Sequence, residues 1–417
     1  MSVRPPRLVC RCARRSYRRE ASDLTTHHVG FVGAGQLARM AGEAVSALGL
    51  SMAVLAERAD DAACAVAAEV VLGTAFDEAA LRALAERCDV VTFDHEQVDL
   101  ELVAALAAEG VVVRPGVGAL ELAVDKAHMR LTLAAAGVPV PAHAIVEPGA
   151  DASGAVAAFA ADHGWPVVLK SARGGYDGKG VWPVQDAGEA EAVLSTVPGR
   201  LVVEEMVPLD AELAVMVARR PFGECLAWPA VETAQVDGVC REVLVPGRLP
   251  AETVEEASAL GRRVADIAGA EGVMAVELFL TGGRLLVNEV ATRPHNSGHW
   301  TIEGAVTSQF ENHVRAVLDL PLGATAPQHA QVASVNVFGG PAGEDPAGLL
   351  ARGLGVEGAH VHLYGKGPKP GRKLGHVTVC GSDAELVRAR AWAAAAALGT
   401  PVPAGVDLPQ AVRRGGA

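Results

Sequence analysis

The chain has 417 residues, half of them hydrophobic and a fifth charged, so it exceeds one ordinary hydrophobic core and two or three domains are expected. Its net charge of −13 and aromatic content of 4% count against nucleic acid as a partner, because nucleic-acid-binding surfaces are basic and rich in stacking rings. The seven cysteines are scattered and no apolar run reaches the ~18 residues of a membrane helix, so we expect reduced thiols, a cytoplasmic location and no membrane partner.

Residues 1–27 are rich in arginine and show no hydrophobic period. We interpret them as a disordered tail or as sequence ahead of the true start codon; an organelle transit peptide is the alternative. From residue 28 onward, short apolar strands alternate with helical patterns. Strands are expected at 28–32, 51–55, 89–93 and 111–113, and helices up to 48 and at 77–87 and 100–108. This alternation predicts an α/β, doubly wound domain over 28–118, with a parallel sheet and helices on both faces.

The rest of the chain has an α+β pattern. A helix over 125–136 stops at the breaker 137–141, and strands 166–170 and 181–184 form a hairpin around a glycine-rich turn. Further strands are expected at 201–205, within 211–245, and at 273–280, 284–290, 331–337, 360–364 and 376–380. Further helices are expected at 251–270, 308–319 and 384–398.

The first strand-to-helix turn carries the run Gly33-Ala-Gly-Gln-Leu-Ala38, which fits a G-x-G-x-x-A dinucleotide fingerprint. Glu57 lies about 20 residues on, where that fingerprint places an acid for the ribose. The same geometry also binds other phosphates at a helix N-terminus. A tight turn without a ligand is the third reading.

A second glycine-rich loop predicts a nucleotide site. The run Gly174-Gly-Tyr-Asp-Gly-Lys-Gly180 lies between the two strands of the hairpin, just after Lys170. Glycines let backbone N–H groups approach phosphates, and Lys170 and Lys179 add positive charge. The loop lacks the G-K-[ST] ending of a Walker A motif, and a flexible lid over a nucleotide is the structure we expect. A surface turn is the alternative.

Two carboxylates predict a magnesium site. Glu277 and Glu289 lie on consecutive strands joined by a Gly282-Gly283 turn, and Asn288 adds an amide oxygen. If the strands pair, both carboxylates can reach one Mg²⁺ that bridges phosphate oxygens. The alternative is a pair of exposed acids at strand ends.

Two polar loops follow these strands. Arg293-Pro-His-Asn-Ser-Gly-His-Trp300 combines an anion-binding arginine with two titratable histidines. The basic stretch 364–373 is suited to a phosphate monoester, although a solvated turn would have a similar composition.

These motifs, in this order, resemble the ATP-grasp ligases. More narrowly, they resemble the 5-(carboxyamino)imidazole ribonucleotide synthase family, over about residues 28–382. The matching runs are Gly33-Ala-Gly-Gln-Leu-Ala-Arg-Met40, Thr92-Phe-Asp-His-Glu96, Gly174-Gly-Tyr-Asp-Gly-Lys-Gly180, Arg293-Pro-His-Asn-Ser-Gly-His-Trp300 and Pro370-Gly-Arg-Lys-Leu-Gly-His376. The resemblance implies an N-terminal doubly wound domain (28–118), a central ATP-grasp domain (119–325, with a lid at about 142–207) and a small C-terminal domain (326–417).

The resemblance also implies roles for individual residues. The expected ATP-binding residues are Lys126, Lys170, Gly174, Gly175, Tyr176, Asp177, Gly178, Lys179, Gly180, Glu204, Glu205, Met206, Val207, Glu212, Asn288 and Glu289. The expected metal ligands are Glu277 and Glu289. The expected ribonucleotide-binding residues are Gln36, Leu37, Tyr176, Asn296, Ser297, Lys366, Arg372 and Lys373. The expected catalytic residues are Asp177, Arg293, His295 and Lys366.

The implied reaction uses ATP and Mg²⁺ to phosphorylate bicarbonate, and the exocyclic amine of aminoimidazole ribonucleotide then captures the carboxyl group. Asp177 or His295 would manage the amine proton. A homodimer that passes its product to a separate mutase is implied as well. The family usually has arginine where Lys179 stands. Other ATP-grasp ligases (a formate-using transformylase or a biotin carboxylase), an NAD-binding oxidoreductase and a silent nucleotide-binding regulator are the competing interpretations.

Overall fold

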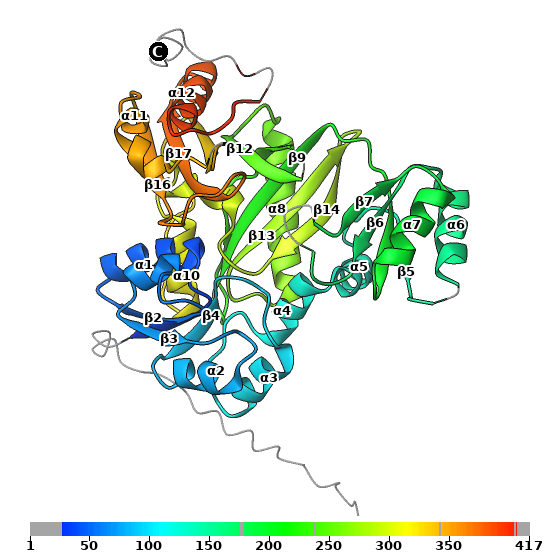
Figure 1. The fold of residues 1–417 in the computed structure, drawn as a ribbon, viewed down its shortest axis with the longest axis horizontal. Helices are drawn as coiled ribbons and strands as arrows, with labels where there is room; N and C mark the ends of the chain where they lie inside the picture. Colours follow the sequence, from blue (N-terminus) through cyan, green and yellow to red (C-terminus); the bar gives the residue numbers. More distant parts are fainter. Residues whose placement is uncertain are drawn as a thin grey trace, which may run out of the picture.

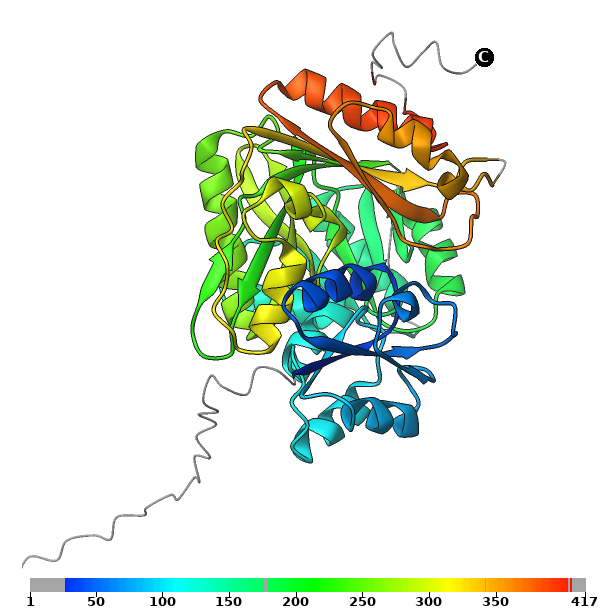
Figure 2. The same ribbon diagram turned by 90° about the vertical axis from the view of Figure 1, so that its left-hand side faces the viewer.

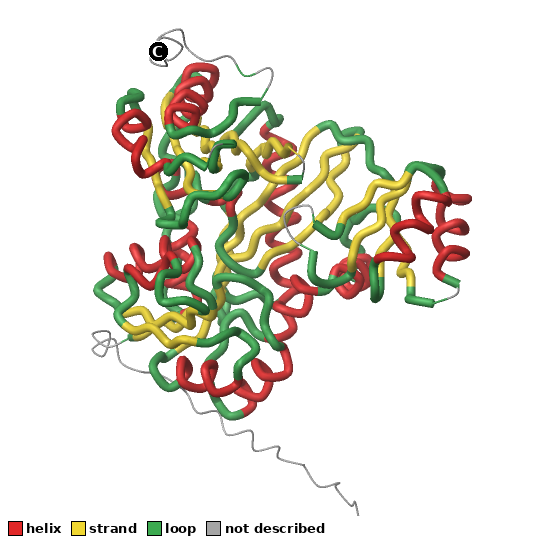
Figure 3. Tube along the Cα trace, viewed as in Figure 1, coloured by secondary structure: helices red, strands yellow, loops and turns green. Residues whose placement is uncertain are grey.

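The structure is a computed structural model that describes residues 27–149, 151–175, 179–236, 238–341, 343–403 and 406. Its strands form three sheets, which Figure 1 and Figure 3 show as an N-terminal domain, a large central sheet and a projecting lobe. The interpretations of residues 1–26 and of Tyr176, Asp177 and Gly178 fall outside the described residues. Of the helices in the described ranges, none is long and apolar enough to cross a membrane.

The N-terminal domain holds a parallel sheet in the order β3-β2-β1-β4. Its strands are β1 (His28–Val32), β2 (Ser51–Ala56), β3 (Glu69–Leu72) and β4 (Val90–Phe93). Its helices are α1 (Gln36–Ala47), α2 (Glu78–Ala85) and α3 (Leu100–Ala108). One face of the sheet packs against α1 and against α10 (Gln309–Val317), and the other packs against α2 and α3. The predicted doubly wound sheet is therefore confirmed, with a helix from the central domain on one face.

The lobe is an antiparallel sheet in the order β5-β8-β6-β7 with two helices. Its elements are β5 (His143–Val146), α6 (Ala152–His163), β6 (Val167–Ser171), β7 (Val181–Val184), α7 (Ala187–Thr196) and β8 (Leu201–Glu205). It is reached through α4 (Val117–Val124) and α5 (Lys126–Ala135). The predicted hairpin is present as β6 and β7, which pair antiparallel on either side of the glycine-rich loop.

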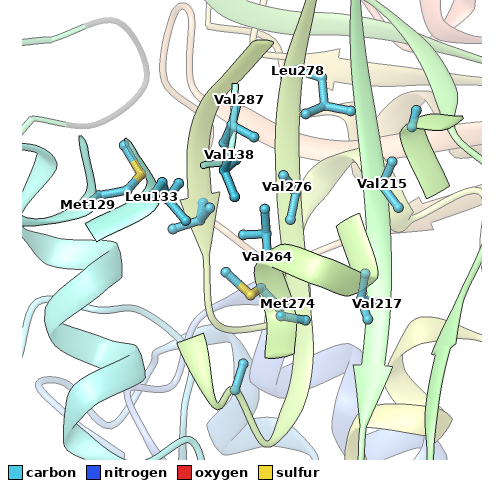
Figure 4. Close-up of a cluster of buried hydrophobic side chains, with 14 of the residues drawn as sticks. Met129, Leu133, Val138, Val215, Val217, Val264, Met274, Val276, Leu278 and Val287 are labelled. Atoms are coloured by element: carbon cyan, nitrogen blue, oxygen red, sulfur yellow. The ribbon is translucent and has the colours of Figure 1, made fainter. Parts of the chain in front are cut away.

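The central sheet runs in the order β14-β13-β9-β11-β12-β15-β17-β16, with β10 beside β9. Its first strands are β9 (Ala211–Arg219), β10 (Cys225–Ala227), β11 (Val231–Val236), β12 (Val239–Val245), β13 (Gly272–Thr281) and β14 (Arg284–Ala291). The helix α8 (Ala251–Ala268) packs on it, and Figure 4 shows Val264 of this helix among side chains from β9, β13 and α5.

The C-terminal strands continue this sheet, because β12 pairs with β15. They are β15 (Gln331–Phe338), β16 (Ala359–Leu363) and β17 (Lys373–Gly381), accompanied by α9 (Thr301–Gly304), α11 (Leu350–Leu354) and α12 (Ala384–Ala397). Glu242 of β12 is 1% exposed and accepts hydrogen bonds from Arg388 and Trp392 of α12. In Figure 2 these C-terminal elements, orange to red, lie above the blue α1.

Some predicted elements differ from the structure. The strand predicted at 111–113 does not form; only a single bridge joins Val91 to Val113. The strands β3 and β5 and the helices α4, α6 and α7 were not predicted. The edge strand β3 is mostly exposed, so it lacks the apolar signal of a core strand. Alanine and glycine in α6 give that helix little amphipathic contrast.

Candidate functional site

The predicted site residues are joined by contacts at β14 and the loop after it, and by one contact between α1 and the loop after β16. Contacts join α5 to β14, β6 to β14, the loop after β4 to the loop after β14, and α1 to the loop after β16. The site therefore depends on all three sheets.

The two predicted metal ligands face each other across a strand pair. Glu277 and Glu289 are direct partners in the antiparallel β13–β14 register, as the turn at Gly282-Gly283 predicted. Lys126 Nζ lies 2.5 Å from Glu289 Oε1, and His295 Nε2 lies 3.7 Å from Glu277 Oε1. Each carboxylate thus has a neighbouring side chain from another element.

A buried chain of charges lies behind them. Lys170 Nζ donates to Glu204 Oε2 at 2.8 Å and to Asn288 Oδ1 at 3.0 Å, and Arg130 Nε donates to Glu204 Oε1 at 2.7 Å. Burial opposes the ionisation of Glu204, but the charges of Arg130 and Lys170 outweigh it and lower its pKa to about 2. Burial lowers the pKa of Lys170, and Glu204 partly offsets that effect. Arg130 was not predicted as a site residue.

The predicted ATP-binding residues 204–207 lie at the end of β8 and just after it. Glu205 is turned toward the lobe, since its Oε1 accepts the backbone N–H of Ala142 at 2.9 Å. Met206 is exposed and Val207 is half-buried. Burial raises the pKa of Glu212, which lies on β9 opposite Phe279 of β13.

The described part of the glycine-rich loop requires its glycines. Gly174 and Gly180 have φ angles of +79° and +77°, a region that favours glycine. A Cβ on Gly175 would lie 2.7 Å from the carbonyl oxygen of Lys179. Gly180 also accepts the N–H of Ser171 at 2.8 Å, and Lys179 is exposed.

The loop after β14 is held by two residues that the sequence reasoning did not place in the site. Glu96 accepts Arg293 Nε at 2.8 Å and the N–H of Thr292 at 3.2 Å. Gln309 is fully buried; its Oε1 accepts the N–H of His295 at 2.9 Å and its Nε2 donates to the carbonyl of His295 at 2.8 Å. The run Thr92-Phe-Asp-His-Glu96 was one of the motifs that carried the family resemblance, so the sequence did contain a signal that Glu96 belongs to the site.

Burial lowers the pKa of His295 to about 3, and the positive charges of Arg293 and Lys373 act in the same direction. The imidazole is therefore neutral at pH 7. Ser297 is buried and its hydroxyl lies 2.9 Å from His295 Nδ1. Both polar side-chain atoms of Asn296 are buried without a hydrogen-bond partner among the described residues, which suits an amide that faces a ligand.

The residues predicted to bind the ribonucleotide come from segments near opposite ends of the chain. Lys366 Nζ donates to Gln36 Oε1 of α1 across 330 residues of sequence. Tyr364 is 1% exposed and packs into the core beneath α1, which anchors the basic loop. Arg372 is exposed and donates to the carbonyl of Gly367. Leu37 is buried in the same core, so only its backbone can face a ligand.

The dinucleotide interpretation of Gly33 to Ala38 is wrong. Asp94 occupies the N-terminus of α1, where its carboxylate accepts the N–H groups of Gly35 and Ala38 at 2.9 and 2.7 Å. Cβ atoms on Gly33 and Gly35 would collide with His95 and Asp94. These glycines therefore permit close packing of the loop after β4, and two of the N–H donors that a pyrophosphate would need are already used by Asp94.

The side chains near Glu277 and Glu289 suit a magnesium ion that is also bound by substrate and water, rather than a metal ion held by protein side chains alone. Within the described residues, no group of three His, Cys, Asp or Glu side chains is arranged to hold a metal ion. Magnesium is usually bound through one or two carboxylates together with substrate phosphates and water. The paired carboxylates of Glu277 and Glu289 fit that pattern.

Comparisons with known proteins match three successive segments of the chain. Family models match the ribonucleotide synthetase preATP-grasp domain at residues 26–124, the ATP-grasp domain at 131–310 and the phosphoribosylaminoimidazole carboxylase C-terminal domain at 333–390. The chain is 47% identical over 382 residues to N5-carboxyaminoimidazole ribonucleotide synthase of Mycobacterium tuberculosis, covering 88% of this chain and 86% of the relative. It is 42% identical to the same enzyme of Corynebacterium ammoniagenes, covering 88% and 91%.

Solved structures are similar as well. The synthase of Aspergillus clavatus in complex with ATP matches with a TM-score of 0.83 and 32% identity, covering 90% of this chain and 99% of that one. The Aspergillus clavatus complex with ADP and 5-aminoimidazole ribonucleotide gives a TM-score of 0.82 and 31% identity, with the same coverage. The Thermus thermophilus synthetase gives 0.81 and 37%, covering 90% and 99%.

Proposed function

The chain belongs to the N5-carboxyaminoimidazole ribonucleotide synthase family of ATP-grasp ligases, and we propose that it carboxylates the exocyclic amine of 5-aminoimidazole ribonucleotide with ATP and bicarbonate. The reaction gives 5-(carboxyamino)imidazole ribonucleotide, ADP and phosphate in purine biosynthesis. The observation that carries the proposal is that the fold brings together each of two sets of predicted site residues. Lys126, Lys170 and Glu289 meet at β14, and Gln36 meets Lys366 between α1 and the loop after β16.

The first set is suited to the polyphosphate of ATP. Lys126 and Lys170 both extend toward β14, and the glycine-rich loop begins directly after the strand of Lys170. Two ammonium groups and backbone N–H donors can stabilise negative charge as a phosphoryl group moves to bicarbonate. Glu277 and Glu289 would hold Mg²⁺, which neutralises phosphate charge when it is bound.

The second set is suited to the ribonucleotide and the small anion. Lys366 and Gln36 join the C-terminal loop to α1, and Lys373 adds positive charge near His295. Glu96 fixes the guanidinium of Arg293, which we assign to bicarbonate and to the carboxyphosphate made from it. Carboxyphosphate is labile in water, so a closed site is a physical requirement of this chemistry.

The amine loses a proton when it gains the carboxyl group. Burial and the charges of Arg293 and Lys373 lower the pKa of His295 to about 3, so its proton affinity is low unless an anion lies beside it. A bound carboxyphosphate would raise that pKa by opposing the charges of Arg293 and Lys373. We therefore keep His295 and Asp177 as the two candidates, and Asp177 lies outside the described residues.

The wider assignments are part of the same proposal. We propose a cytoplasmic homodimer that passes its product to a separate mutase. The described cysteines are unpaired, which suits a reducing compartment. The edge strand β3 exposes Leu72, and Phe76 follows it with 61% of its side chain exposed, which offers an apolar surface for a second copy. Size-exclusion chromatography with light scattering tests the dimer, and a monomer at all concentrations would contradict it.

Phosphate release tests the activity. The purified chain should hydrolyse ATP with bicarbonate and Mg²⁺, and aminoimidazole ribonucleotide should stimulate the rate. Carboxylation can be followed in parallel by incorporation of labelled bicarbonate. Absence of stimulation by the ribonucleotide would overturn the substrate assignment, while a nucleotide-dependent rate with another acceptor would point to a different ATP-grasp ligase.

A further inference from the structure

Lys126 occupies the first position of α5, where a positive charge is unfavourable on its own. Helix N-termini carry partial positive charge from unsatisfied N–H groups, so acidic side chains are preferred there. The Lys126 side chain is nevertheless only 10% exposed, and its Nζ contacts Glu289 Oε1 at 2.5 Å. Glu289 therefore compensates the charge of the ammonium group.

The backbone around Lys126 is fixed, so only its side chain can change partners. The N–H of Lys126 donates to the carbonyl of Ala172 at 2.8 Å. Asp125 caps the helix by accepting the N–H of His128 at 3.0 Å, and its other oxygen accepts Arg173 Nε at 2.8 Å. These bonds tie the start of α5 to the segment that leads into the glycine-rich loop.

Glu289 also has a like charge beside it. It is the cross-strand partner of Glu277, and like charges directly opposite each other on paired strands repel. The ammonium group of Lys126 relieves this repulsion. Lys126 thus neutralises the charge of Glu289, as a divalent cation would when bound at this site.

We propose that Lys126 is an internal counter-ion of the metal site, which blocks Glu289 until ATP draws the ammonium group onto its phosphates. The inference rests on the proposed function, because it takes Glu277 and Glu289 as the metal ligands. The polyphosphate supplies negative charge for both cations, so the metal ion binds with the nucleotide and only weakly before it. Lys126 then has two successive partners, a carboxylate and a phosphate.

Manganese binding without nucleotide tests this directly. Mn²⁺ replaces Mg²⁺ at oxygen sites and is measured by electron paramagnetic resonance on the full chain, with no turnover required. The wild-type chain should bind Mn²⁺ weakly without nucleotide, and Lys126→Met should bind it about tenfold more tightly, a gain of about 1.4 kcal/mol. A non-hydrolysable ATP analogue should tighten binding in the wild type and reduce the difference between the two proteins.

Two further variants isolate the cause. Lys126→Arg keeps the positive charge and should bind Mn²⁺ as the wild type does. Arg284→Met removes an equal charge from an exposed position on the same strand as Glu289, so it should leave Mn²⁺ binding within about twofold of the wild type. Thermal unfolding of each variant confirms that it is folded.

The outcomes separate this inference from the proposed function. Equal Mn²⁺ binding by the wild type and Lys126→Met without nucleotide, together with tight binding with the analogue, would overturn the inference and leave the metal ligands in place. Tighter binding in Arg284→Met than in Lys126→Met would also overturn it. Failure of every protein to bind Mn²⁺ with the analogue would overturn the metal assignment itself, and the inference with it.

Discussion

The guanidinium of Arg130 donates to Glu204 at 2.7 Å in a place where both side chains are almost fully buried. Glu204 uses its other oxygen to hold Lys170, so Arg130 acts on Lys170 through a shared carboxylate. Arg130 Nη1 also donates to the carbonyl of Val287 at 3.3 Å, which links α5 to β14. A buried charge of this kind is costly unless every partner is present.

We predict that Arg130→Met lowers the free energy of unfolding by about 3 kcal/mol, because it leaves the buried Glu204 with one cation instead of two. It should also raise KM for ATP by loosening Lys170, with a smaller change in KM for the ribonucleotide. Chemical denaturation and steady-state kinetics measure the two effects. The double variant Arg130→Met with Glu204→Gln should be less destabilised than the sum of the two single variants; additive losses would contradict the shared-carboxylate relationship.

Replacement of Glu289 tests the metal assignment. Glu289→Ala should abolish turnover, because it removes one of two cross-strand carboxylates and the partner of Lys126. Glu255→Ala, on an exposed part of α8, is the matched control and should retain full activity. Substantial activity in Glu289→Ala at saturating Mg²⁺ would refute its role as a metal ligand.

Local patterns in the sequence predicted the parts of the fold and site that depend on neighbours in the chain. The Gly282-Gly283 turn between two apolar strands was enough to predict that Glu277 and Glu289 pair, and the register confirms it. The hairpin around the glycine-rich loop was predicted in the same way. Turn chemistry and strand alternation carry this information because the partners are only a few residues apart.

Partners that are distant in the chain left no local signal. Arg130 reads as one more basic residue on a helix, and its partner Glu204 is 74 positions away. The anion at the N-terminus of α1 is Asp94, 59 positions from Gly35, so the glycine fingerprint alone could not show that its donors were in use. Glu96 and Arg293 are 197 positions apart and belong to different domains. Only the folded topology places these groups together.

Glu96 should act through Arg293. Glu96→Gln retains the size of the side chain but removes the charge that accepts Arg293 Nε. We expect kcat to fall on the order of tenfold to a hundredfold, because a small displacement of a group that positions a reactant greatly lowers the catalytic rate. KM for ATP should change little. Rates at saturating substrates measure this. A selective rise in KM for ATP would show that Glu96 affects ATP binding instead of acting through Arg293.

Gln309 should act through the loop that carries His295. Its amide oxygen accepts the N–H of His295, while its amide nitrogen donates to the carbonyl of His295 and lies 3.1 Å from His299 Nδ1. Gln309→Leu should therefore lower kcat more than it changes KM for ATP, at a stability cost of about 1–3 kcal/mol for the unpaired buried groups. Gln309→Glu should not restore the rate, because a carboxylate cannot donate to His299. Full activity in Gln309→Leu would show that the loop keeps its shape without this residue.

His313 should make the stability of the chain depend on acid pH. Its Nδ1 accepts the N–H of Val273 at 3.1 Å, so the ring is neutral and its Nε2 donates to Thr92 Oγ1 at 3.0 Å. Burial lowers the pKa of His313 to about 3, whereas an unfolded histidine has a pKa of about 6.5. Between these values the unfolded chain binds a proton that the folded chain does not. Stability is therefore full above pH 6.5 and is lost as the pH falls toward 3.

We expect this single group to contribute about 1.4 kcal/mol of lost stability per pH unit over that window. His313→Leu should be less stable at pH 7, through loss of two buried hydrogen bonds, but its stability should fall less steeply between pH 6 and 4. His329→Leu is the control, because His329 is exposed. Urea unfolding at several pH values gives both slopes. Identical slopes for the wild type and His313→Leu would mean that His313 takes up its proton in the folded chain as readily as in the unfolded one, and the neutral bridge between Thr92 and Val273 would be wrong.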